Sequence, residues 1–222
     1  MKKSFLIFVV ALFSLISKAQ VNTYTTTGVE MKLTGVQLED TQNPNQIPRF
    51  TLWYNFTEYF HFDVAKSFGF FTGIGIENVG FIADYNDSMR TKIKFRSYMA
   101  TMPLGIKIGN FDKQDPMFFF AGGAISVPFH YKEKVFFNDK KDNVFHEWFS
   151  SRTNFLQPSA FAGFTFPNKM SLKVEYFFEN FMNRGFTENT GGVDIKSYEH
   201  IVQSNIIAVT LSSSFTNVKK KK

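Results

Sequence analysis

Charged side chains at alternating positions are the residues of this sequence that could do chemistry. Lysine and glutamate recur within apolar segments, on faces that also carry Gly, Ser and Thr. Charges enclosed in a protein need partners, because an unpaired buried charge is strongly destabilising. Three lysines nearly balance four glutamates, so we expect an internal network of ion pairs and hydrogen bonds with a structural role. Its members are Glu30, Lys32, Glu77, Lys107, Lys173, Glu175 and Glu179.

Histidine is the second residue type to consider, because it serves as a general base and as a metal ligand. None of the four histidines lies in a recognised nucleophile motif or at metal-ligand spacing, and the chain has no cysteine. We therefore expect no enzymatic activity, no metal and no cofactor. The histidines are His61, His130, His146 and His200.

The long connection 132–153 holds a set of residues suited to binding. Four lysines alternate there with large aromatic side chains. Exposed aromatics in a loop favour an interaction surface, although they also suit packing against neighbouring loops or a girdle at a membrane surface. The candidate interaction residues are Phe136, Phe137, Phe145, Trp148 and Phe149, interleaved with Lys132, Lys134, Lys140 and Lys141.

Period-two alternation identifies the elements that must position these residues. In 170–179, apolar residues occupy every second position, and the complementary face holds Lys173, Glu175 and Glu179. Helical periodicity is nearly absent after residue 20. The pattern predicts eight strands, over 28–38, 50–63, 68–77, 98–109, 117–131, 154–166, 170–179 and 206–215.

The connections between these strands alternate in length, as in outer-membrane barrels. Apolar faces of about 9–11 residues suit a bilayer. A sheet in hydrocarbon must close on itself, because unpaired backbone groups there are costly. We expect an all-β fold, an eight-stranded antiparallel up-and-down transmembrane β-barrel whose lumen is packed rather than an open pore. The longer connections are 39–49, 83–90, 132–153 and 183–203, and the shorter ones are 64–67, 110–116 and 167–169.

Some residues conflict with this simple pattern. Glu58 falls on the apolar side of its strand, so we expect a bulge that shifts the register there. Pro103, Pro128 and Pro158 lie inside predicted strands, where each removes a backbone donor, so they should mark bulges or strand ends.

The two ends of the chain are distinct from the barrel. Residues 1–19 combine Lys2 and Lys3, an apolar stretch and small residues before Gln20, which predicts a signal peptide. Residues 20–218 form the predicted barrel, and 219–222 form a basic tail. The 25 basic and 19 acidic residues give +6, but both ends supply the excess of positive charge. No basic face for nucleic acid is implied.

Short motifs within the strands add a resemblance to a known family. They are Pro103-Leu104-Gly105-Ile106-Lys107, the run 158–163 and Leu172-Lys173-Val174-Glu175-Tyr176. Together with the signal sequence and strand plan, they resemble Gram-negative outer-membrane β-barrel domain proteins of the OmpA/OmpX-like and PorT-type group. The resemblance implies an outer-membrane location. The partners expected there are outer-membrane lipid and lipopolysaccharide, the outer-membrane assembly machinery, and a surface or periplasmic protein. Unlike many such barrels, the chain continues beyond its last aromatic, Phe215.

Three functional hypotheses follow. The leading one is an outer-membrane barrel with a structural or surface-interaction role. The second is a soluble secreted barrel that binds an apolar ligand inside, as lipocalins do. The third is an envelope enzyme that modifies lipids, with His130 expected inside the barrel near its outer rim.

Overall fold

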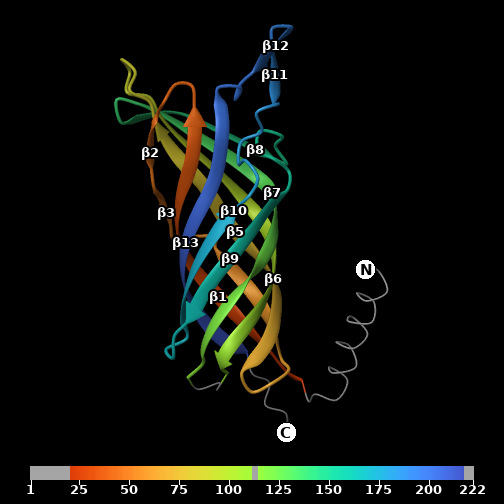
Figure 1. The fold of residues 1–222 in the computed structure, drawn as a ribbon. Coiled ribbons are helices and arrows are strands. Elements are labelled where there is room, and N and C mark those ends of the chain that lie inside the picture. Colours follow the sequence, from red (N-terminus) through yellow and green to blue (C-terminus); the bar gives the residue numbers. More distant parts are fainter. Residues whose placement is uncertain (1–20, 112–114, 218–222) are drawn as a thin grey trace.

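The structure is a computed structural model that describes residues 21–111 and 115–217. Eight strands form a closed antiparallel ring in which each pairs with its neighbours in the chain, and the last pairs with the first (Figure 1). The predicted eight-stranded up-and-down barrel is confirmed. The ring consists of β1 (Asn22–Asp40), β4 (Phe56–Asp63), β5 (Phe68–Asp84), β6 (Lys92–Asn110), β7 (Met117–Phe137), β9 (Gln157–Thr165), β10 (Met170–Phe177) and β13 (Ile201–Asn217).

The predicted signal peptide at 1–19 and basic tail at 219–222 lie outside the described residues. Within the part of the chain that the structure describes, no helix is both long and apolar enough to cross a membrane.

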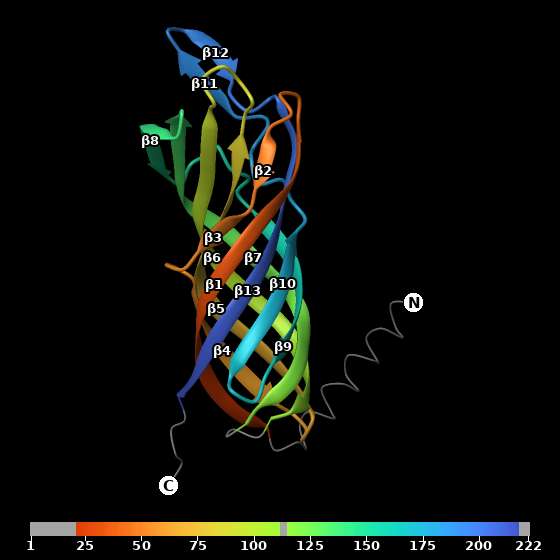
Figure 2. The same cartoon turned by 90° about the vertical axis from the view of Figure 1, so that its left-hand side faces the viewer.

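The two ends of the barrel differ, as the alternating connection lengths predict. One end, hereafter the turn end, carries the connections 64–67 and 166–169, the end of β6, the start of β7, the start of β1 and the end of β13. The opposite end, hereafter the loop end, carries the longer connections (Figures 1 and 2). These include β2 (Asn45–Ile47), β8 (Lys140–Trp148), and the hairpin of β11 (Thr187–Thr190) and β12 (Val193–Lys196).

Five ring strands extend further than predicted. They have 17 to 21 residues; the additional length of β5, β6, β7 and β13 lies mainly at the loop end, whereas β1 is extended mainly at the turn end. The apolar alternation stops partway along these strands because the outward residues beyond it are polar, such as Thr25, Arg96 and Lys132. A search for apolar alternation therefore detects only the part of each strand that faces an apolar surrounding.

The second ring strand is interrupted, contrary to the continuous strand predicted over 50–63. It divides into β3 (Arg49–Thr51) and β4, and Tyr54 between them adopts a positive φ of 64°. Asn55 bridges the interruption. Its backbone oxygen accepts a hydrogen bond from the Glu30 amide at 3.0 Å, and its side-chain oxygen accepts one from the Asn78 amide at 2.7 Å.

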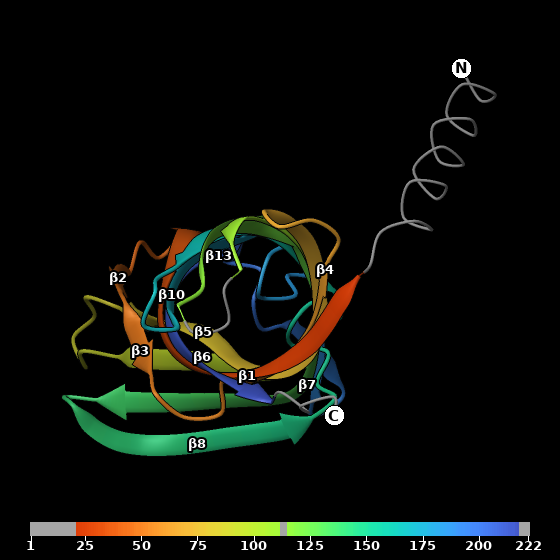
Figure 3. The same ribbon diagram turned by 90° about the horizontal axis from the view of Figure 1, so that it is seen from below.

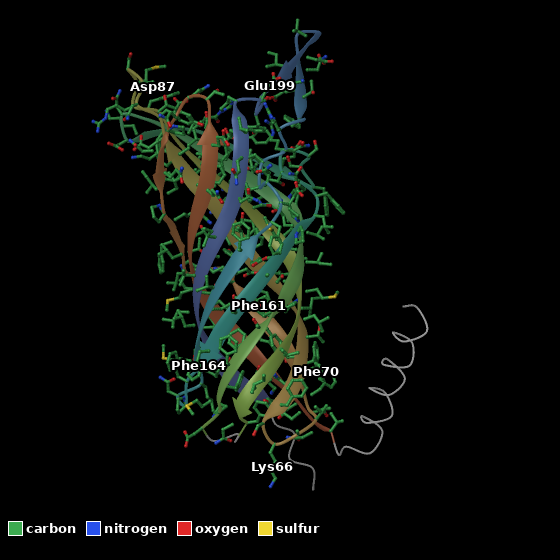
Figure 4. All side chains as sticks on the ribbon, viewed as in Figure 1. Lys66, Phe70, Asp87, Phe161, Phe164 and Glu199 are labelled. Atoms are coloured by element: carbon green, nitrogen blue, oxygen red, sulfur yellow. The ribbon has the colours of Figure 1, made fainter. Side chains whose placement is uncertain are left out.

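Side chains alternate across the barrel wall as predicted. Leu172 and Val174 of β10 face outward and are 42% and 50% exposed, whereas Glu175 on the same strand is buried inside. Figure 4 shows the same division near the turn end, where Phe70 and Phe164 lie on the wall below Phe161. Phe161 itself is buried. Apolar side chains therefore form the outer surface, and the charged side chains of the pattern lie within.

A bulge in β7 corrects the predicted position of His130. The pairing with β6 shifts by one residue between Tyr98 and Met99, opposite Phe129. The extra residue reverses the alternation, so that Tyr131 points inward and His130 lies on the outer face. The prediction that Pro128 marks a bulge is confirmed, because it lies next to this shift.

The bulge expected at Glu58 is absent. The pairing of β4 with β1 and β5 runs without a shift through Glu58, so its carboxylate faces outward. There it accepts a hydrogen bond from the Thr27 hydroxyl at 2.5 Å. Pro103 also lies in mid-strand without a register shift, whereas Pro158 lies at the start of β9, as predicted.

The interior has three layers. An aromatic cluster occupies the turn end, with Phe71, Phe118, Phe120 and Phe161 among its members. Charged and hydroxyl side chains occupy the middle. An apolar core fills the loop end, where Phe181, Met182 and Tyr198 of the connection 178–200 pack against wall residues. The small and charged interior expected from the sequence is thus correct for the middle of the barrel and incomplete for both ends.

Candidate functional site

The middle layer contains most of the predicted charge network. Lys32 of β1 lies at its centre, forms an ion pair with Glu77 of β5, and lies 3.9 Å from both Glu30 and Glu175. Lys173 pairs with Glu175 at 3.1 Å. Lys32 and Glu175 are each 1% exposed. Five of the seven predicted residues therefore share one buried cluster with two positive and three negative charges.

Hydroxyl groups connect this cluster to the surrounding wall. Ser126 of β7 donates a hydrogen bond to Glu77 at 2.5 Å, and Ser159 of β9 donates one to Glu175 at 2.7 Å. Tyr59 of β4 donates one to Glu30 at 3.1 Å. The cluster thus joins strands on opposite sides of the ring. Such a set of paired and hydrogen-bonded groups suits a structural role better than proton transfer.

The other two predicted members lie elsewhere. Lys107 forms a separate site near the turn end, where it pairs with Asp63 at 2.6 Å and donates a hydrogen bond to the Tyr24 hydroxyl at 2.7 Å. Glu179 is wrong as a member of the network, because β10 ends at Phe177 and Glu179 is exposed beyond it. The regular strand ends before this position, so the alternation no longer places residue 179 inside.

Asp63 is a buried charged residue that the predicted network does not include, although the alternation along its strand places its side chain inside the barrel. It lies on the inner face of β4, two residues after the buried His61. Its register opposite Gly69, which itself pairs with Lys107, brings the carboxylate to the lysine. A strand-by-strand register is needed to predict this pair, and the sequence alone does not fix it.

A cavity of about 80 Å³ opens in the lumen between the charged layer and the turn end. One side is aromatic, with Phe71, Phe120 and Phe161, and the opposite side presents hydroxyl groups such as Ser212 and Ser214. His61 also lines it, accepting or donating a hydrogen bond with the Thr26 hydroxyl at 2.9 Å. The cavity is small beside the barrel that surrounds it and has no group of metal ligands: the described residues contain no cluster of three His, Asp or Glu side chains able to hold a metal ion.

The structure distributes the five predicted loop aromatics over different environments. Phe145 packs against the apolar core, whereas Phe136 lies on the outer face, where its ring is 4.7 Å from the Lys94 ammonium. Phe137 ends β7 and is half-buried. Trp148 and Phe149 are 63% and 77% exposed. The five residues thus do not form one continuous aromatic surface.

Trp148 instead belongs to a row of aromatic rings on the outer wall. Its ring stacks on Phe129 at 6.0 Å, Phe129 stacks on Tyr98 at 6.5 Å, and Tyr98 meets Tyr54 edge-on at 5.4 Å. Aromatic rings concentrate where a membrane meets water. This row lies where the outward residues change from apolar to charged.

Arg152 organises the connections at the loop end and was not predicted. Its guanidinium lies 4.3 Å from the ring of Phe145 and 4.5 Å from that of Phe186, and it pairs with Glu188 at 2.9 Å. It also donates a hydrogen bond to the Tyr198 hydroxyl at 3.1 Å. Hydrogen bonding from Arg152 lowers the pKa of Glu188. One buried arginine thus ties β8 to the connection that carries β11 and β12.

No protein-family model and no curated protein matches the sequence. Solved structures do match in fold. Ail, the attachment invasion locus protein of Yersinia pestis, in complex with the heparin analogue sucrose octasulfate, is 10% identical with a TM-score of 0.38, over 87% of this chain and 99% of that one. Neisserial surface protein A is 10% identical with a TM-score of 0.35, over 88% and 99%. The N-terminal β-barrel domain of Pseudomonas aeruginosa OprF is 7% identical with a TM-score of 0.30, over 87% and 100%. The similarity of the chain to these proteins is one of fold alone.

Proposed function

We propose that this chain is a non-enzymatic β-barrel of the outer membrane of a Gram-negative bacterium, exported by its signal peptide. Its role is structural or in surface interaction. The observation that carries the proposal is the sorting of side chains across the wall: apolar residues such as Val174 and Val209 are exposed outside, and charges such as Lys32 and Glu175 are buried inside. A continuous exposed apolar surface is unfavourable in water and favourable in hydrocarbon. The same sorting disfavours a soluble barrel with an apolar pocket.

The lumen in this proposal is closed to solutes. The support comes from its three layers, in which Lys32, Glu77 and Glu175 bridge the middle and Phe181 and Met182 enter from the loop end. A barrel of eight strands leaves an interior about as wide as its own side chains. The protein would then act through its outer wall and its loop end.

The surface partners belong to the same proposal. We expect outer-membrane lipid and lipopolysaccharide around the wall, the assembly machinery during insertion, and a protein partner at the loop end. The exposed residues Trp148 and Phe149 at the aromatic row support contact with the membrane surface. Phe136, Phe137 and Phe145 have other surroundings, so they contribute to such contact less directly.

A non-enzymatic role agrees with the position of His130, the residue that the enzyme hypothesis requires. Its ring contacts Tyr98, His146 and Trp148 on the outer wall, with ring centroids 5.5, 5.8 and 4.6 Å away. None of these neighbours is a carboxylate or a nucleophile, whereas hydrolytic triads need both near the base.

Membrane fractionation followed by solute flux tests the proposal. Mature protein should pellet with outer membranes and should change its migration on a denaturing gel after boiling. Proteoliposomes should release a trapped small sugar no faster than protein-free liposomes. Recovery in the soluble fraction would contradict the membrane location, and sustained sugar release would contradict the closed lumen.

A further inference from the structure

The strongest feature outside the lumen is a group of positive charges on the outer wall, just above the aromatic row. Lys94 and Arg96 of β6 and Lys132 and Lys134 of β7 share this face, and Lys141 of β8 lies beside them. We name these five residues the cationic face. Lys94 lies directly opposite Lys134, and Arg96 directly opposite Lys132. Like charges opposite each other on neighbouring strands are destabilising. This arrangement of cations therefore lowers the stability of the fold.

In the described ranges of the chain, the five residues of the cationic face lack carboxylate partners, although the neighbouring Lys92 has two. Lys92, the next outward residue of β6, lies 3.7 Å from Asp84 and 2.9 Å from Asp139. Among the residues that the structure describes, no carboxylate lies within ion-pair distance of the five cations. Glu133 of β7 points inward, where the hydroxyls of Tyr131 and Tyr198 donate hydrogen bonds to it at 2.6 and 3.0 Å.

Two further observations show that the cations are close together and incompletely satisfied. The Nε of Arg96 is buried without a hydrogen-bond partner in the described structure. Partial burial lowers the pKa of the Lys134 ammonium, and the charges of Arg96, Lys132, Lys141 and Lys94 lower it further. An anion bound between these side chains would remove their repulsion and supply the missing acceptor.

The orientation of the sheet determines which anion can reach this face. β9 pairs with β7 only up to Ser126, and β8 takes its place from His130 onward. Beyond this exchange β7 and β8 leave the ring, and Figure 3 shows them lying outside it when the barrel is viewed from below. A sheet that leans outward as it rises turns its outer face toward the membrane surface. In the membrane location proposed above, this orientation places the cationic face over the polar heads of the surrounding lipid.

We propose that the cationic face binds the phosphate groups of the lipid A headgroup of lipopolysaccharide in the outer leaflet. The inference rests on the membrane location proposed above and extends it, because it assigns a lipid site to named residues. Arg presents a fork of donors to phosphate oxygens, and the lysines around it supply charge. The aromatic row below, with Trp148 and Tyr98, contacts the adjoining apolar part of the lipid.

The test uses the refolded mature protein in neutral-detergent micelles that contain diphosphoryl lipid A. The chain has two tryptophans, and Trp53→Phe leaves Trp148 beside the cationic face as the fluorescent reporter. In this background the four changes Lys94→Gln, Arg96→Gln, Lys132→Gln and Lys134→Gln remove charge from the face. Each cation near an anionic lipid surface contributes roughly fivefold in affinity, so the loss of all four should weaken binding by about six-hundredfold.

Two control proteins make the result specific. The first removes four cations of the loop end that lie off the face, with Arg90→Gln, Lys140→Gln, Arg184→Gln and Lys196→Gln, and should bind as the unchanged protein does. The second exchanges Lys and Arg at the four face positions and should retain most of the affinity, since charge is preserved. Heat-modifiability on a denaturing gel verifies that every variant is a folded barrel.

Several outcomes would overturn the proposal. Equal loss in the off-face control, or equal binding of lipid A that lacks phosphate, would show that the face does not recognise these phosphates. Binding of a soluble sulfated polysaccharide with no binding of lipid A would assign the face to a different partner. Failure of the proposed function can be told apart from failure of this inference. If the proposed function fails, the protein is soluble or conducts solutes. If only this inference fails, the protein is a closed membrane barrel whose binding of lipid A does not depend on the phosphates.

Discussion

At the scale of single residues, the buried lysine at the centre of the barrel explains why the interior holds together. Lys32 contacts three glutamates on three strands, and the cluster as a whole carries one more negative charge than positive. Removing one partner of a buried pair is far more damaging than replacing both, because the remaining charge loses its compensation. The cluster should therefore respond to substitutions in pairs.

Lys32→Met is expected to destabilise the barrel by about 3–5 kcal/mol, since it leaves Glu77 buried without its main partner. The double variant Lys32→Met with Glu77→Met should recover most of that loss, because it returns the cluster to its original charge difference. The free energy of unfolding in urea, measured in lipid vesicles, gives both values. If the double variant is as unstable as the sum of the single ones, the two residues are not coupled.

Glu58 is an outward carboxylate among apolar residues such as Phe56, Phe60 and Ile74. Lipid-facing acidic residues are unfavourable, so Glu58→Leu should stabilise the barrel in vesicles by roughly 1–2 kcal/mol. Thr25→Val, on the neighbouring strand and also outward, serves as a control that should change stability little. A loss of stability in Glu58→Leu would indicate that the carboxylate contacts a partner in the membrane.

At the scale of elements, small irregularities decide which residues meet. The extra residue at Phe129 moves His130 from the lumen to the outer wall, and the end of β10 at Phe177 leaves Glu179 outside. The sequence predicts the alternation within strands because it repeats over many residues. It does not predict where a single residue interrupts the alternation, since such a position depends on the partner strand.

The hairpin of β11 and β12 provides a prediction at this scale. Hydrogen bonding from Arg152 lowers the pKa of Glu188 below its usual value of 4.5. The ionised carboxylate therefore stabilises the docked hairpin fully at pH values above 4.5. This contribution is lost as the pH falls through the lowered pKa. Proteolysis of 183–200 by an acid-active protease should therefore accelerate as the pH falls through the lowered pKa of Glu188. Glu188→Gln should be cleaved rapidly at every pH. A cleavage rate in the unchanged protein that does not vary with pH beyond the protease's own profile would contradict this role.

At the scale of the whole molecule, the barrel combines a closed wall with a loop end of different character. The sequence predicts the wall well, because apolar residues outside and small or charged residues inside repeat with a period of two. It predicts the loop end poorly, because β8, the Arg152 contacts and the apolar core around Phe181 depend on connections without a regular pattern. The cationic face illustrates both: its lysines are visible in the sequence, and their shared face requires the register of three strands.

The most direct test of the account concerns which way consecutive residues of β13 point. The chain has no cysteine, so single cysteines at positions 211 to 215 can carry a spin label. In lipid vesicles, oxygen accessibility should be high at Leu211→Cys, Ser213→Cys and Phe215→Cys, which face outward. It should be low at Ser212→Cys and Ser214→Cys, which line the lumen cavity. Uniform accessibility, or the opposite alternation, would contradict a barrel with its apolar wall in lipid.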